Sequence, residues 1–419
     1  MSDLETVEAF RERARTWIRA NLEKAKPERV RGRESDDVEA AKVNRDREIQ
    51  RMLFDAGLAG ICVPTEYGGQ GLTYAHQLAL NEELSGYEHA TFIQVPTMTP
   101  CMAVLLDFAS EEIKKRHVPR ILRGEEIWMQ FLSEPSGGSD VAGAQTTAVR
   151  DGDEWVLNGS KIWTTGAWWS DWAICLARTN WDVPKHRGLT VFIVPIRHPG
   201  IEVQRIEMLN GSKEFCQEFI SDARIPDEWR IGEVDQGWTV GTRWMYHERT
   251  VGGGSAYVTR PAGGAREGRG VSSTAIAKLA IGKGTIGDGH VRQLIGENLM
   301  MSLVGPELIK RVAQGIRLKK TSDQAAAIGR LWTGVSSVRS ASIAYEVASA
   351  GTVAWDEEDL DYSGEYSNGF IMRQAACIAG GTTEMARNGI SERVLGMPRD
   401  RTFDRDMAFR DVPRSAPTK

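Results

Sequence analysis

The chain has 419 residues, of which 41% are hydrophobic and 26% are charged, and its formal net charge is −5. This length is enough for two or three domains with buried cores. Acidic and basic residues are mixed along the whole sequence, so no basic stripe indicates nucleic acid and no polybasic cluster indicates a membrane surface. These features favour a globular protein, and its overall charge indicates no particular class of binding partner.

The cysteines and the first residues indicate where such a protein works. The five cysteines include no Cys-x-x-Cys pair, which argues against a zinc site or a disulfide framework and fits a reducing compartment. The N-terminal residues lack an apolar signal-peptide core, and no run elsewhere is long enough to span a bilayer. We expect a cytoplasmic protein without a metal site.

The first part of the chain has the pattern of packed helices. Apolar residues recur at three- and four-residue steps from Val7 to Leu22, which is the spacing of an amphipathic helix with one buried stripe. The same spacing recurs in three later stretches, with glycine and proline between them: 49–58, 77–84 and 113–122. We predict an N-terminal α-helical domain over residues 1–130.

The character of the sequence then changes twice. Short segments rich in β-branched and aromatic residues, separated by turn residues, predict a compact β-domain over 131–237. The predicted strands are 152–165, 171–179, 188–196, 200–206 and 215–226. Helical spacing returns at Trp238, which predicts a C-terminal α-helical domain over 238–398 and leaves 399–419 as a C-terminal arm or tail. The predicted fold class is α+β.

One motif in the C-terminal part indicates a function that its context excludes. Gly282, Gly284 and Gly287 match the Gly-x-Gly-x-x-Gly pattern of dinucleotide binding, and Glu307 follows at about the expected twenty residues. That motif needs a buried strand before it, whereas the preceding Ser-Ser-Thr-Ala-Ile-Ala-Lys-Leu-Ala is alanine-rich and predicts a helix. We therefore expect no Rossmann site here.

Two neighbouring segments carry residues suited to a cofactor. In residues 130–143 the glycines allow a turn whose N–H groups can converge on an anion, and serine hydroxyls add donors. In residues 161–169 the indole of Trp163 offers a flat surface beside two threonine hydroxyls that can donate to ring heteroatoms. Together they suggest a flat, polar, phosphate-bearing cofactor. The alternatives are ordinary turn-making and capping for the hydroxyls and core packing for Trp163.

These segments resemble signatures of the acyl-CoA dehydrogenase family. SEPSGGSDVAG is similar to its first signature, apart from Phe131 where a small residue usually opens it. GLAGICVPTEYGGQG (57–71), LNGSKIWTTGA (157–167) and GGTTEMARNGISERVLG (380–396) resemble its N-terminal segment, its flavin-ring strand and its C-terminal flavin-binding helix. The resemblance implies a helical domain, a β-barrel-like middle domain and a C-terminal four-helix bundle around non-covalent FAD. It also implies oxidation of an acyl-CoA thioester to the 2,3-enoyl-CoA.

The resemblance also implies roles for single residues. Leu132 and Ser133 would meet the flavin pyrimidine, Trp163 would flank the ring, and Thr165 would lie near N5. The residues implied near FAD are Leu132, Ser133, Gly138, Ser139, Trp163, Thr164, Thr165, Thr382, Thr383 and Glu384. Those implied near the acyl-CoA are Ser139, Tyr246, Arg249 and Gly381.

The reaction needs a base on the substrate face opposite the flavin. In much of the family this base is the Glu before the Gly-Thr of the C-terminal motif, but Gly380 stands at that position here. Isovaleryl- and long-chain-type members take the carboxylate from a Glu-Arg pair on a helix, which aligns with Glu248 and Arg249. Neighbours on a helix point about 100° apart, so these two can serve different tasks. Glu248 is the predicted catalytic base.

The surroundings of Glu248 support this role. Apolar neighbours such as Trp244 would raise its pKa, and glycines 252–254 would leave space for a ligand beside it. The alternatives are a solvated helix charge for Glu248, a surface cation for Arg249 and a core position for Tyr246. The small residues after Arg249 favour a bulky or branched acyl group.

Two family segments are missing from this sequence. The Arg-x-x-Phe-Gly segment is not visible between 260 and 300, where Arg292 is a possible substitute cation, and the Gln-x-x-Gly-Gly-x-Gly segment is replaced near 346–361. Similar losses occur in members that assemble from two different chains, so a homotetramer and a heterotetramer both stay open. Three functions are therefore carried forward: a dehydrogenase with electron-transfer flavoprotein as its acceptor, a non-catalytic structural subunit, and an oxygen-using flavin oxidase or monooxygenase.

Overall fold

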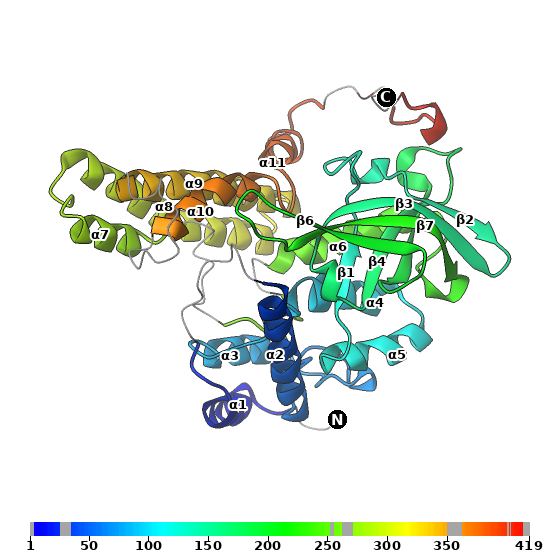
Figure 1. Ribbon diagram of the computed structural model, residues 1–419, viewed down its shortest axis with the longest axis horizontal. Helices are drawn as coiled ribbons and strands as arrows, with labels where there is room; N and C mark the ends of the chain where they lie inside the picture. The colour runs from blue at the N-terminus through cyan, green and yellow to red at the C-terminus, as the bar shows by residue number, and fades with distance from the viewer. Residues whose placement is uncertain are drawn as a thin grey trace.

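The structure is a computed structural model. It describes residues 4–25, 35–251, 255–261, 271–349, 363–399, 402 and 404–413. No helix in these ranges is long and apolar enough to cross a membrane. Three groups of elements follow one another along the chain: helices, a sheet, and helices again (Figure 1).

The N-terminal helices contain the four stretches predicted as helical. The elements are α1 (Val7–Asn21), α2 (Asp36–Asp55), α3 (Tyr74–Glu83), the π-helical η2 (Gln94–Met102), α4 (Ala103–Phe108) and α5 (Glu111–Leu122). Thr6, Ser35 and Ser110 begin three of these helices by accepting a hydrogen bond from a first-turn N–H group. The apolar stripe of α1, made of Phe10, Ala14 and Ile18, is buried as its spacing predicts.

The middle of the chain forms one mixed sheet. Its strands are β1 (Trp128–Phe131), β2 (Thr147–Asp151), β3 (Glu154–Thr165), β4 (Trp172–Arg178), β5 (Leu189–Pro195), β6 (Ile201–Ile206), β7 (Phe215–Pro226) and β8 (Arg230–Ile231), in the order β6-β7-β3-β2-β4-β5-β8, with β1 beside β4. The five predicted strands are β3 to β7, whereas β1, β2 and β8 were not predicted. β4 and β5 are buried on both faces, which explains their continuous apolar runs.

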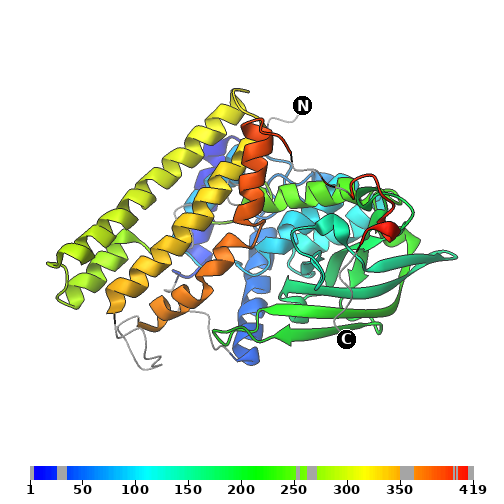
Figure 2. The same ribbon diagram turned by 90° about the horizontal axis from the view of Figure 1, so that it is seen from above.

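The C-terminal helices form a layer beside the sheet and the N-terminal helices (Figures 1 and 2). They are α7 (Ser273–Gly282), α8 (Gly289–Arg317), α9 (Ala326–Ala348), α10 (Ser363–Met372) and α11 (Thr383–Gly389), preceded by α6 (Gly237–Thr250). Helix α7 leads into the Gly-x-Gly-x-x-Gly string, so the helix predicted there is confirmed, and it stands where a dinucleotide fingerprint would need a buried strand.

Helix α6 lies where the sheet meets the N-terminal helices. Trp244 of α6 belongs to the same buried cluster as Trp128 of β1, Leu105 of α4 and Val191 of β5. Both the sheet and η2 contact α6. The helix that carries Glu248 is therefore fixed by packing on two sides.

Part of the predicted C-terminal arm or tail packs against the sheet. Phe409 is buried, and the Arg178 guanidinium lies 3.7 Å from the centre of its ring. Lys185 forms ion pairs of 2.9 Å with both Asp404 and Asp140, and so links the arm to the loop that carries Ser139.

Candidate active site

Trp163 stands out on β3 because it is the extra residue of a β-bulge. Ile162 pairs with Gln217 and Thr164 pairs with Cys216, which leaves Trp163 without a partner on β7. Its φ is 65°, a left-handed conformation that costs a residue with a side chain about 1–2 kcal/mol. Its side chain is 54% exposed. The bulge therefore holds a large aromatic ring out of the core, which is a common use of bulges near binding sites.

Two hydroxyls without a partner among the described residues lie on β3 and on the loop next to it. The loop after β1 lies against β3, because the Ile162 N–H donates to the Ser133 carbonyl over 3.0 Å. The Ser133 and Thr165 hydroxyls, on the two sides of that contact, have no hydrogen-bond partner among the described residues. A flat exposed ring with free donors beside it fits the flat, polar ring system of a flavin, which needs both stacking and hydrogen bonds.

Thr164 faces the other way. Its side chain is buried, and its Oγ1 lies 2.9 Å from Glu218 Oε2 and 3.4 Å from the Gln130 carbonyl oxygen. Only its backbone is available to a ligand on the face of Trp163 and Thr165.

A buried ion pair fixes the loop to β3. Lys161 Nζ donates to Glu134 Oε1 over 2.8 Å, and both side chains are buried. Glu134 also accepts from the N–H groups of Gln145 and Thr146. Burial raises the pKa of Glu134, but the Lys161 ammonium and these donors outweigh it and hold the pKa below its ordinary value. Ser133 is thus held in place by its neighbour Glu134.

Glu248 lies near the C-terminal end of α6. The residue as a whole is half-buried, but protein atoms surround its carboxylate, and this burial raises its pKa above the ordinary value while the adjacent Arg249 opposes the shift. Its carboxylate has no hydrogen bond or ion pair with the described residues. It lies near the buried Cys101 of η2, because the charge of Glu248 contributes to the raised pKa of that thiol after burial itself. A solvated helix charge does not describe this carboxylate.

Hydrogen bonds connect the helix of Glu248 to the strand of Trp163. Trp244 lies one helical turn before Glu248 on the same face, and its Nε1 donates to Gln130 Oε1. The Gln130 carbonyl in turn meets Thr164, the neighbour of Trp163. The predicted base and the predicted flavin surface therefore belong to one connected part of the molecule.

The outer side of α6 is anchored separately. Asp107 of α4 accepts hydrogen bonds from Arg243 Nε over 2.6 Å and from His247 Nε2 over 2.8 Å. Arg249 and Tyr246 are exposed. The predicted glycines 252–254 lie outside the described residues.

The predicted C-terminal contacts lie on α11. Thr382 begins this helix by accepting from the Met385 N–H, and Thr383 is buried and donates to the Glu384 carboxylate. Gly380 and Gly381 have φ values of +70° and +95°, and open space surrounds them. These residues pack on α9 rather than on the sheet (Figure 1). Arg292, the possible substitute cation, is exposed on α8.

Comparisons with known proteins identify the family. Residues 5–125 match the acyl-CoA dehydrogenase N-terminal domain, and residues 130–222 match the middle domain. Acyl-CoA dehydrogenase IpdE1 of Mycolicibacterium smegmatis is 30% identical over 407 residues, which cover 94% of this chain and 98% of that protein. The chain belongs to the acyl-CoA dehydrogenase family. It is thus an oxidoreductase of a flavoprotein family.

Two further members of the family are similar over most of the chain. Cyclohexane-1-carbonyl-CoA dehydrogenase of Syntrophus aciditrophicus is 27% identical over an alignment that covers 72% of this chain and 78% of that protein. A solved structure named "Tcur3481-Tcur3483 steroid ACAD" is 25% identical, with a TM-score of 0.72. The superposition covers 95% of this chain and 100% of the chain in that structure.

Family motifs predicted two groups of site residues, which the structure places in different parts of the molecule. Leu132 and Ser133 lie in a loop that contacts β3, the strand of Trp163 and Thr165, whereas Gly381, Thr382, Thr383 and Glu384 lie at the start of the separate helix α11. The motifs gave no role to three buried charged residues in and beside β3: Glu134, Lys161 and Glu218. Lys161 and Glu218 could have been noticed as charged residues at inward positions of predicted strands, whereas Glu134 lies in the turn segment 130–143 and had no such signal.

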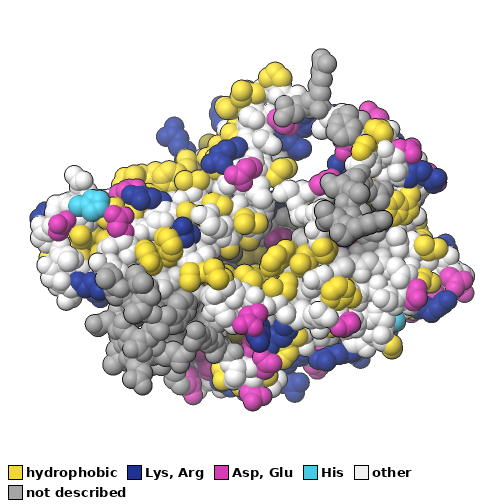
Figure 3. Space-filling view, turned by 45° about the horizontal axis from the view of Figure 1, so that its top comes forward, with side chains coloured by type: hydrophobic (Ala, Val, Ile, Leu, Met, Phe, Trp, Pro, Cys, Tyr) yellow, Lys and Arg dark blue, Asp and Glu magenta, His cyan; other side chains and the backbone are white. Residues whose placement is uncertain are grey.

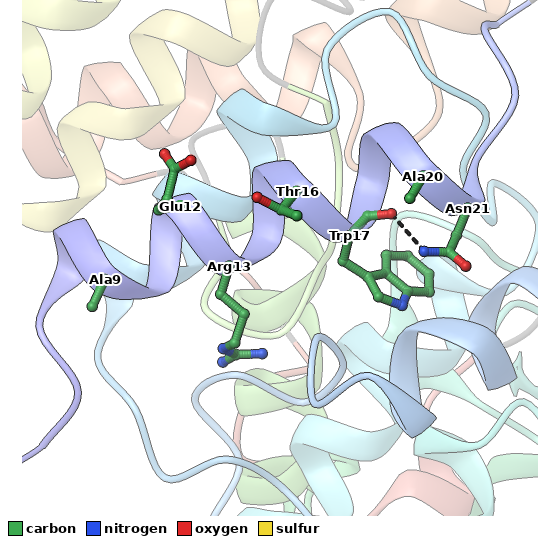
Figure 4. A pocket seen from close by; sticks show the side chains of 7 residues that line it. All are labelled: Ala9, Glu12, Arg13, Thr16, Trp17, Ala20 and Asn21. Carbon is green, nitrogen blue, oxygen red and sulfur yellow. Dashed lines mark hydrogen bonds between the residues drawn. The ribbon is translucent and has the colours of Figure 1, made fainter.

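Surface depressions differ in their chemistry. Figure 3 shows a hollow between the C-terminal helices and the sheet, bordered by hydrophobic side chains and with an acidic side chain inside. A second depression runs along the outer face of α1, where Arg13, Trp17 and Asn21 line it (Figure 4). Asn21 donates a hydrogen bond to the Trp17 carbonyl, and Arg13 donates to the Glu5 carboxylate. The polar groups of this depression are therefore already paired within the protein, and it is no candidate for an acyl-CoA dehydrogenase active site.

Proposed function

We propose that this protein is an FAD-dependent acyl-CoA dehydrogenase in which Glu248 removes the α-proton of the thioester and a 2,3-enoyl-CoA is formed. The observation that carries the proposal is the Glu248 carboxylate, which is surrounded by protein atoms and free of hydrogen bonds to the described residues. FAD, when bound, would supply the acceptor for the β-hydride.

The residues present suit the cofactor. Trp163 would stack beside the ring, while Ser133 and Thr165 would donate to its polar edge and Leu132 would meet it through the backbone. The loop with Gly138 and Ser139 and the start of α11, with Thr382, Thr383 and Glu384, would approach the rest of the cofactor. In this arrangement the backbone of Thr164, rather than its hydroxyl, would face the ligand.

The setting of Glu248 suits a base. The Glu248 carboxylate makes no hydrogen bond with the described residues, so its lone pairs are available to the α-proton, and burial strengthens it as a base. Arg249 would stay near the thioester without pairing with Glu248, and Tyr246 and Gly381 would line the same cleft. The Asp107 contacts with His247 and Arg243 would keep α6 from moving during the proton transfer.

The acyl group is proposed to be bulky or cyclic. The names of two similar proteins refer to a cyclohexane carboxylic acid and to a steroid, both of which are ring systems. Initial rates on cyclic and on short straight-chain thioesters would test this proposal, and activity on the straight chains alone would contradict it.

The decisive experiment is Glu248→Gln, which keeps the size of the side chain and removes its charge. We expect retained flavin and a rate of anaerobic flavin bleaching by acyl-CoA that falls by about 10²–10⁴-fold, the usual contribution of a general base. Glu233→Gln, an exposed exchange just before α6, is the matched control. Unchanged bleaching in Glu248→Gln would refute the assignment.

A non-catalytic subunit is the second candidate, and Gly380 favours it. This residue stands where much of the family has its base, and its left-handed φ of +70° disfavours any side chain there. A purified chain that stays colourless and gains flavin only with a second subunit would support this candidate.

Assembly and electron transfer are part of the proposal. Large apolar side chains along α8 are exposed: Leu299, Met300, Leu303, Val304 and Ile309. A stripe of this kind usually becomes buried between subunits, so we propose a homo- or heterotetramer, with electron-transfer flavoprotein as the acceptor. Its size in solution and its reduction of that acceptor would test both points.

A further inference from the structure

Glu218 is a fully buried acid that the proposed reaction does not use. It lies on β7 directly opposite Lys161 of β3, and both side chains are 0% exposed. A buried carboxylate is normally paired with a cation or fully hydrogen-bonded. Among the described residues Glu218 has neither arrangement, because it forms no ion pair and its Oε1 has no hydrogen-bond partner.

Among the described residues, the cation whose charge acts on Glu218 is Lys161, and it is already engaged. Lys161 directs its three N–H donors to Glu134 Oε1, the Leu132 carbonyl and the Leu176 carbonyl. An ammonium has no fourth donor for Glu218. Lys161 and Glu134 balance each other, so an ionised Glu218 would leave one uncompensated negative charge in the core.

The hydrogen bonds around Thr164 require one more proton. Its Oγ1 meets two acceptors, Glu218 Oε2 at 2.9 Å and the Gln130 carbonyl at 3.4 Å, but a hydroxyl has a single proton to donate. If Glu218 is a neutral acid, its O–H donates to Thr164 and the Thr164 hydroxyl donates to Gln130. A neutral Glu218 therefore satisfies both contacts.

We propose that Glu218 is a positioning residue that is protonated in the folded protein and donates a hydrogen bond to Thr164. This hydrogen bond holds the bulge so that Trp163 and Thr165 face the cofactor. The inference rests on the proposed FAD site. Thr164 is the residue between those two side chains, so a change in its buried hydrogen bond acts directly on both.

Loss of this proton would weaken the site at alkaline pH. Burial raises the pKa of Glu218 to about 8, while its bond from Thr164 and the charge of Lys161 act in the opposite direction. Among the described residues, the charge of Glu218 acts on the thiols of Cys175 and Cys216, and burial raises the pKa of each thiol to about 11. Glu134 also acts on Cys175, and Arg205 of β6 acts on Cys216. Lys161 with Glu134 stays a balanced pair, so Glu218 is the group that titrates near pH 8.

Infrared difference spectra of the full-length protein without cofactor test the protonation directly. Wild type minus Glu218→Gln is expected to show the carbonyl band of a protonated carboxyl at about pH 6.5, which disappears by about pH 9.5. Absence of this band at the lower pH would overturn the inference, whether or not the protein binds FAD.

Dissociation constants for FAD, measured by flavin fluorescence, test the positioning role. The side-chain amide of the Glu218→Gln variant keeps a donor for Thr164, so we expect an affinity within about threefold of wild type that does not vary with pH. The affinity of wild type for FAD is expected to fall about tenfold between pH 6.5 and 9.5. The affinity of Glu218→Leu is expected to be about tenfold below that of wild type at pH 6.5 and to stay there at every pH. Glu202→Gln, an exposed exchange on β6, is the matched control.

Other results have defined meanings. If Glu218→Gln binds FAD as weakly as Glu218→Leu, or if Glu218→Leu binds as wild type does, the positioning role is refuted. If Glu218→Leu does not fold, Thr164→Val replaces it and should weaken binding by the same factor. If wild type binds no FAD at any pH, the proposed function fails, while the infrared band still decides the state of Glu218.

Discussion

The free energy of unfolding should depend on pH in a way that the Glu218→Gln variant removes. The pKa of Glu218 is about 8 in the folded protein, against an ordinary value of 4.5 that we assign to the unfolded chain. Between these values the folded state binds more protons than the unfolded state, so stability falls as pH rises. The loss begins near pH 4.5 and levels off above about pH 8.

The magnitude follows from the width of this interval. Each unit of pKa difference is worth about 1.4 kcal/mol, so the whole interval corresponds to about 5 kcal/mol. Between about pH 5.5 and 8.5 the expected change is about 3 kcal/mol, because part of the titration lies outside this range. Glutamine does not titrate, so the free energy of unfolding of Glu218→Gln should not show this fall. As pH rises over the same interval, the variant should therefore gain this amount of stability relative to wild type.

Urea unfolding followed by tryptophan fluorescence at these two pH values measures the difference. Other titrating groups contribute equally to both proteins and cancel. Glu202→Gln is expected to run within about 0.5 kcal/mol of wild type at both pH values, as exposed substitutions usually do. Parallel curves for wild type and Glu218→Gln would show that Glu218 is ionised when folded or is solvated.

Three other predictions concern the same strand and the turn after it. Lys161→Met should cost about 3–5 kcal/mol in urea unfolding, because it leaves Glu134 buried without a counter-charge, and Lys161→Met with Glu134→Gln should recover part of that loss. Trp163→Gly should lower FAD affinity without destabilising the protein in thermal unfolding, because glycine relieves the left-handed strain. Gly166→Ala should destabilise by more than about 2 kcal/mol, since an added Cβ would come within 2.0 Å of an indole, whereas Gly152→Ala, at a similar φ in open space, should cost only about 1 kcal/mol.

Periodicity predicted the main elements of the fold because burial sets periodicity. In α1 the stripe of Phe10, Ala14 and Ile18 follows the helical repeat, and these side chains form the core of the N-terminal helices. β4 and β5 could be predicted because both of their faces are buried. A strand of this kind has a continuous apolar run in its sequence. The short β1 and β8 have too few residues to show a period.

The site could not be predicted from alternation. Along β3, Trp155, Leu157 and Lys161 are buried at positions that fit an alternation of two residues, and the same alternation assigns Trp163 to the core. The bulge at Trp163 inserts one residue and reverses this phase, so Trp163 turns outward and Thr164 turns inward. Register with β7 decides this reversal, and register is a tertiary property that periodicity within one strand does not contain.

The inward turn of Thr164 explains why the core of this sheet contains polar groups. A threonine hydroxyl that is forced inward can both donate and accept, and an apolar residue at position 218 would leave it only the longer contact with the Gln130 carbonyl, at a cost of about 1–3 kcal/mol. A neutral acid opposite the bulge supplies that partner without adding a charge beside the balanced Lys161 and Glu134 pair. The same bulge that exposes Trp163 for the proposed cofactor therefore creates the need for Glu218, which ties the buried acid to the exposed surface of the strand.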